Sequence, residues 1–172
     1  IANLLQRQKD AVSLCTFDEE IEIQTPVKST PTHVHKVFLE LETVLKKPKS
    51  QRKTAVAKVL HEIADKIHKR SLVVIFSDMF EDTSKTEELF SALQHLKHNK
   101  HEVVVFHVTD KQHELDFTYD NRPYVFVDME TGEKVKLRSN EVKSFYTEQM
   151  SEYIKTLKLR CHQYHIDFVE AD

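Results

Sequence analysis

Apolar residues recur along the chain with two spacings, one typical of β-strands and one typical of amphipathic helices. Strand-like patterns occupy residues 11–17, 20–25, 71–77, 102–108, 124–128, 133–137 and 166–169. Helical spacing occupies residues 1–8, 34–45, 54–69, 87–97 and 140–164. Strands that alternate with helices predict an α/β fold, and residues 1–172 are long enough to form a single domain with its own core.

The two most apolar runs, residues 71–77 and 102–108, predict parallel strands that are covered on both faces. The helix between them predicts a right-handed crossover. Residues 11–17 and 20–25 predict instead an antiparallel pair at one side of the sheet. Gly132 lies between two short strands, where a hairpin turn can use a positive φ.

Gly132 is the only glycine among 172 residues, where average usage predicts about 12. A dinucleotide fingerprint needs three glycines and a phosphate-binding P-loop needs two, because backbone must approach phosphate without a Cβ in between. The composition therefore excludes these nucleotide sites. It also excludes kinase-type glycine-rich loops and the serine-hydrolase elbow, which has two flanking glycines.

Charge and hydropathy exclude several classes of partner. The chain has 25 Lys and Arg residues and 28 Asp and Glu residues, a formal net charge of −3, so neither nucleic acid nor an anionic membrane is expected to bind it. Its purely apolar runs are about five residues long, too short for a spanning helix of roughly 20. Cys15 and Cys161 form no CxxC pair and are interpreted as reduced thiols of a cytoplasmic protein.

Asp78 is the leading candidate for a functional residue. It directly follows the most apolar strand, and ligands of parallel sheets gather at the carboxyl ends of the strands. Together with Glu81 and Asp82 it could offer oxygen ligands to Mg²⁺ or Mn²⁺; a helix cap or a solvated turn is the alternative. Asp110 and Asp116 follow the next strand and could reach the same edge, although loop solvation explains them as well.

The other polar clusters have simpler interpretations. Residues 82–86 resemble an oxygen cluster for a cation, but Ser84 and Glu87 have the spacing of a helix capping box. The chain has 11 histidines without an HExxH motif or a Cys/His quartet. No nucleophile or general base can be identified from the sequence, which gives no positive argument for an enzyme.

The residues around Asp78 also carry a family resemblance. The chain resembles a von Willebrand factor A-like domain and, more closely, the bacterial family called domain of unknown function fifty-eight. The matching segments are residues 8–14, 16–18, 70–78, 113–117, 128–133 and 165–169, together with Cys161. Relatives tend to carry glycine where this chain has Lys9 and Ser13.

This resemblance implies a doubly wound, mostly parallel sheet and a metal-ion-dependent adhesion site. Such a site uses a D-x-S-x-S loop after the first, central strand, a threonine from a second loop and an aspartate from a third. By position, Thr54 would be that threonine and Asp78 that aspartate. A carboxylate from a protein partner would complete the shell of Mg²⁺ or Mn²⁺, and a MoxR-type AAA+ ATPase is the first partner implied.

The chain departs from the family pattern at both ends. It contains no D-x-S-x-S loop, and it lacks the first central strand and the last helix. We therefore expect a fragment of a longer protein, in which the metal binds the full-length form and binds these residues weakly or not at all. The expected function is a non-enzymatic interaction module. The alternatives are a metal-independent scaffold of the same fold and a metal-dependent phosphate-ester hydrolase.

Overall fold

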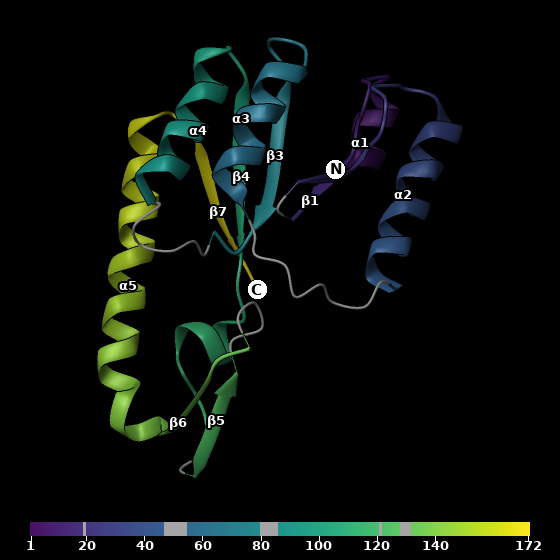
Figure 1. Ribbon diagram of the computed structural model, residues 1–172. Coiled ribbons are helices and arrows are strands. Elements are labelled where there is room, and N and C mark those ends of the chain that lie inside the picture. The colour runs from purple at the N-terminus through teal and green to yellow at the C-terminus, as the bar shows by residue number, and fades with distance from the viewer. Residues whose placement is uncertain (19, 47–54, 80–85, 121, 128–131) are drawn as a thin grey trace. The chain divides into compact units, whose positions relative to one another are not determined.

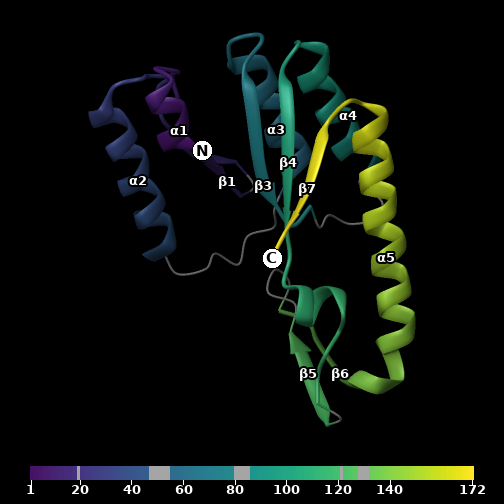
Figure 2. The ribbon, with the colours of Figure 1, turned by 180° about the vertical axis from the view of Figure 1, so that it is seen from behind.

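The computed structural model describes residues 1–18, 20–46, 55–79, 86–120, 122–127 and 132–172. The chain divides into two compact units, residues 1–55 and residues 56–172. Figure 1 shows the helices and strands of both units, and Figure 2 shows them from behind. In the part of the chain that is described, no helix combines the length and the apolar character needed to cross a membrane.

The first unit contains a small antiparallel sheet and two helices. Its elements are α1 (Ala2–Arg7), β1 (Cys15–Phe17), β2 (Ile21–Gln24) and α2 (Pro31–Lys46). β1 pairs with β2 as predicted, but the strand expected over residues 11–17 is shorter, with an isolated bridge between Val12 and Lys28. The Nε2 of the buried His33 of α2 lies 3.0 Å from the Val12 carbonyl oxygen. This contact fixes the segment around Val12 against the helix.

The second unit is built on a parallel sheet with the strand order β3-β4-β7. Its main elements are α3 (Val56–Lys66), β3 (Leu72–Ser77), α4 (Thr86–His98), β4 (Glu102–Val108) and β7 (Asp167–Ala171). β3 and β4 are in register from Leu72 opposite Glu102 to Ser77 opposite His107. The predicted α/β class is therefore confirmed, with the parallel strands where the apolar runs placed them.

Helices α3 and α4 lie against one face of this sheet (Figures 1 and 2). That face is apolar because alternate residues of each strand point to it, and Val105 of β4 is buried against the helices with Leu60 and Leu93. The other face carries Leu72 and Phe76, which are 50% and 60% exposed. Within this unit the helices thus cover one face of β3, where the apolar run predicted cover on both.

A hairpin and a long helix complete the second unit. They are β5 (Pro123–Val127), β6 (Lys134–Arg138) and α5 (Ser139–Gln163). The predicted hairpin is confirmed, and Gly132 has a φ of +73°. The helix predicted over residues 140–164 is confirmed, but its apolar positions are not all covered: Ile154, Leu157 and Cys161 are buried, whereas Phe145 is 67% exposed.

Between β4 and the hairpin lies a π-helical turn that the sequence did not predict, η2 (Lys111–Leu115). Aromatic rings pack together next to the η2 turn. Phe117 is buried and lies 4.5 Å, centroid to centroid, from Tyr146 of α5, and 5.7 Å from Phe126 of β5. This cluster joins η2, the hairpin and α5, so the loop that follows β4 has a core of its own.

Three helices end in left-handed residues that are not glycine. Lys9 follows α1, Lys100 follows α4 and His165 follows α5, with φ of 64°, 64° and 54°. At each end the next residue donates its backbone N–H to a carbonyl five residues back, as Asp10 does to Leu5. These are Schellman turns, whose left-handed position glycine normally occupies because it has no Cβ.

Candidate functional site

Strand β3 ends in a turn at Asp78, and hydrogen bonds hold the backbone of this turn in place. Asp78 is exposed, whereas the next residue, Met79, is 1% exposed and has a φ of 55°. The Ser77 hydroxyl accepts a hydrogen bond of 3.0 Å from the Met79 N–H, and the Tyr153 hydroxyl of α5 donates one to the Met79 carbonyl oxygen. A left-handed methionine costs about 1–3 kcal/mol, so these contacts hold a strained backbone in place.

A buried histidine of β4 lies near the same turn. His107 is fully buried, and the backbone of Asp78 is close enough to its ring to influence its pKa. Burial lowers the pKa of His107, while the carboxylates of Asp78, Glu170 and Glu114 act in the opposite direction. The ends of β3, β4 and β7 therefore bring acidic side chains into the electrostatic range of one imidazole.

The two acidic residues after β4 have local structural roles. Asp110 caps η2, because its carboxylate accepts a hydrogen bond of 3.0 Å from the His113 N–H and lies 2.7 Å from the His113 Nδ1. This bonding to His113 lowers the pKa of Asp110. Asp116 is the C-terminal cap residue of the same turn. The geometry therefore favours a structural role in the loop for Asp110.

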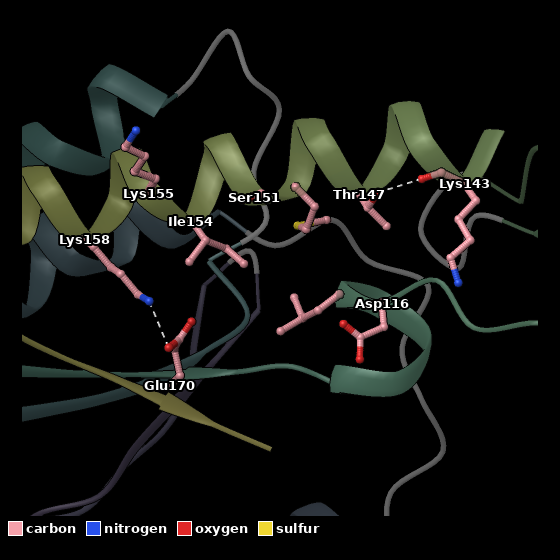
Figure 3. Close-up of a pocket in the computed structure, with 10 residues that line it drawn as sticks. Asp116, Lys143, Thr147, Ser151, Ile154, Lys155, Lys158 and Glu170 are labelled. Carbon is pink, nitrogen blue, oxygen red and sulfur yellow. Dashed lines mark hydrogen bonds and ion pairs between the residues drawn. The ribbon is translucent and has the colours of Figure 1, made fainter.

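An open cleft of about 770 Å³ lies beside this edge of the sheet. Figure 3 shows its walls, one formed by α5 and the other by η2 and β7. Lys158 of α5 pairs across it with Glu170 of β7, with 2.9 Å between Nζ and Oε2. The residues that line the cleft are Leu115, Asp116, Lys143, Thr147, Met150, Ser151, Ile154, Lys155, Lys158 and Glu170. The cleft presents charges of both signs, from Asp116 and Glu170 and from the lysines of α5, beside the apolar side chains of Leu115, Met150 and Ile154.

Of the metal ligands implied by the resemblance, only Asp78 falls in the described part of the chain. Thr54 lies outside it, as do Glu81 and Asp82 of the hydrolase alternative and Ser84 of the capping box. No group of three or more His, Cys, Asp or Glu residues within the described ranges could hold a metal ion. These residues by themselves therefore supply a single carboxylate and do not fit a complete Mg²⁺ shell.

The residues that lie near the Asp78 turn from other elements were not found from the sequence. His107 and Tyr153 lie 29 and 75 positions beyond Asp78, and nothing in a local pattern links them to it. Two of the histidines have structural roles: the His33 ring contacts the Val12 carbonyl oxygen, and His101 accepts a hydrogen bond from the Ser71 N–H.

The chain matches a model of one known protein family. A family model described as "Protein of unknown function DUF58" matches residues 1–154. The chain belongs to this family. The DUF58 match includes the strands β3 and β4, Asp78, His107 and Tyr153, and it ends within α5. No curated protein and no solved structure matches this DUF58 chain.

Proposed function

We propose that this DUF58 chain is a non-enzymatic protein-interaction module with a doubly wound, von Willebrand factor A-like fold. Its binding surface is the carboxyl edge of β3-β4-β7, and its partner is a MoxR-type AAA+ ATPase that offers a carboxylate to the metal-bound form. A cytoplasmic location fits such a partner.

The observation that carries this proposal is the turn at Asp78. An exposed carboxylate stands directly before a buried, left-handed methionine whose backbone is bonded at both its N–H and its carbonyl. Strained backbone persists only where the surroundings hold it, and such positions cluster at binding sites. A rigid turn presents its carboxylate to a partner at a smaller entropic cost than a flexible loop would, which supports recognition.

The proposal includes Mg²⁺ or Mn²⁺ only for a form of the protein that has a full set of oxygen ligands. Asp78 and Thr54 are the residues of this chain that we propose as ligands. When bound, the ion would attract a partner carboxylate. Because two ligands are too few for a hard cation, residues 1–172 alone are expected to bind Mg²⁺ weakly or not at all. Tight Mg²⁺ binding in titration calorimetry of this chain would contradict this part of the proposal.

The partner is tested by measuring binding between the purified chain and a MoxR-type AAA+ ATPase by biolayer interferometry. The Asp78→Ala variant should weaken binding about tenfold or more, the effect of losing a central interface residue. Asp167→Ala, which removes an exposed carboxylate at the opposite end of the sheet, should leave binding unchanged. No binding by the wild type, or equal losses in both variants, would reject the proposed surface.

A further inference from the structure

In the second unit, two histidines on neighbouring helices have their rings in contact, at a place separate from the Asp78 turn. The Nδ1 of His61 in α3 lies 3.0 Å from the Nδ1 of His95 in α4. Their ring centroids are 5.2 Å apart and the rings are tilted by 43°. In the sequence these residues are 34 positions apart, so they form no recognisable metal motif.

A carboxylate orients one of the two rings. The Nε2 of His95 lies 3.3 Å from Oδ1 of Asp65, one helical turn after His61. A proton on Nε2 that faces Asp65 leaves the Nδ1 of His95 with a lone pair directed at His61. Metal-binding histidines commonly have this arrangement, in which the second nitrogen donates to a carboxylate and the first binds the ion.

We propose that His61 and His95 form a two-histidine site for a divalent transition-metal ion of the Zn²⁺, Ni²⁺ or Cu²⁺ class. Imidazole nitrogen suits these ions and not Mg²⁺. At Zn–N distances of about 2.0–2.1 Å, a tetrahedral ion holds two nitrogens roughly 3.3–3.4 Å apart. The two rings therefore need to separate by only a few tenths of an ångström, while His61 moves its proton from Nδ1 to Nε2.

The surrounding helices favour such a site. Leu60 of α3 and Leu93 and Leu96 of α4 are buried, so the packed backbones hold the two rings at a set spacing. His61 and His95 are themselves half-buried, which leaves the remaining coordination positions to water. Within the described residues no third protein ligand completes the cluster, so the structure assigns an open site.

Titration calorimetry of the 172-residue chain with Zn²⁺ and Ni²⁺ tests the proposal. We expect one saturable site in the wild type and its loss in His61→Ala and in His95→Ala. His98→Ala, which removes an exposed histidine of the same helix α4, should bind as the wild type does. Absence of a saturable site, or its persistence in either of the first two variants, would overturn the proposal.

Two further measurements separate a metal site from a structural role of these rings. Asp65→Asn should weaken Zn²⁺ binding about 10- to 100-fold through the ring of His95, whereas Glu62→Gln, which removes the partner of Lys66 on the same helix, should not. In the wild type, Zn²⁺ should shift the Nδ1 resonances of His61 and His95 in nitrogen-15 spectra. Shifts confined to other histidines would reject the site even if the alanine variants fail to fold.

Discussion

The hydroxyl of Tyr153 donates a hydrogen bond to the carbonyl oxygen of Met79, across 74 residues of sequence. This contact joins the long helix α5 to the turn that follows β3. Met79 is buried with a left-handed backbone, so its carbonyl has little access to water as an alternative partner. The position of Asp78, directly before Met79, thus depends on a helix that is distant in sequence.

Replacing this tyrosine tests that dependence. Tyr153→Phe removes the donor and leaves a buried carbonyl unsatisfied, which should lower the free energy of unfolding by about 1–3 kcal/mol. Urea denaturation measures the change. Tyr119→Phe is the matched control, because within the described part of the chain the Tyr119 hydroxyl makes no hydrogen bond; it should cost less than about 0.5 kcal/mol. Equal losses in the two variants would contradict a specific role for the Tyr153 bond.

The sequence predicted the elements of the fold because their signals are local. Residues 102–108 were expected to form a strand and do so with the same bounds as β4, since five of these seven positions are apolar and bounded by polar residues. The periodicity did not reveal what covers each face. Phe76 and Phe145 follow the predicted patterns but remain exposed, because burial depends on whether another element packs there.

The candidate site was only partly predictable for the same reason. Asp78 could be found because its position after an apolar strand is a local feature. Its neighbours from other elements could not, since His107 and Tyr153 reach the turn from β4 and α5 through tertiary packing. The η2 turn was missed because its cap, Asp110, also suits an ordinary loop.

Two buried histidines should make the stability of the second unit depend on pH. His101 and His107 are 1% and 0% exposed, and burial lowers the pKa of each. In the unfolded chain their pKa is about 6.5. Below that pH the unfolded state binds protons that the folded state does not, so the free energy of unfolding falls as the pH falls toward the folded pKa values.

Denaturant unfolding at a series of pH values measures this effect. Each histidine contributes a slope of at most about 1.4 kcal/mol per pH unit. The His107→Asn variant should be less stable at neutral pH but should show a smaller slope below about pH 6.5. His98→Asn, at an exposed position, should keep the wild-type slope. An unchanged slope in His107→Asn would show that another group titrates.

The two cysteines should differ in reactivity. Cys161 is buried in α5, and burial raises its pKa to about 11. The thiolate is the reactive form, so at pH 8 only about one Cys161 in a thousand is ionised in the folded protein. Cys15 is half-buried in β1. A disulfide reagent should therefore label Cys15 first and Cys161 only on unfolding; labelling of Cys161 at an equal rate in the folded protein would contradict its burial.

The left-handed helix ends predict where added glycine stabilises this chain. Lys9, Lys100 and His165 are exposed and have positive φ, a conformation that costs a residue with a Cβ about 1–2 kcal/mol. Glycine avoids this cost but loses about 0.5–1 kcal/mol of backbone entropy on folding. Each of Lys9→Gly, Lys100→Gly and His165→Gly should therefore raise the free energy of unfolding of its unit by about 0.5–1 kcal/mol.

Thermal and urea unfolding of the single variants test this prediction, and Gln94→Gly is the control within the same helix as Lys100. Gln94 is exposed inside α4, where glycine should cost about 1 kcal/mol. Opposite signs at positions 94 and 100 would show that the backbone conformation, and not the loss of a side chain, decides the outcome. Because the scarcity of glycine leaves these turns strained, a destabilised Lys100→Gly variant would mean that the lysine makes a compensating contact.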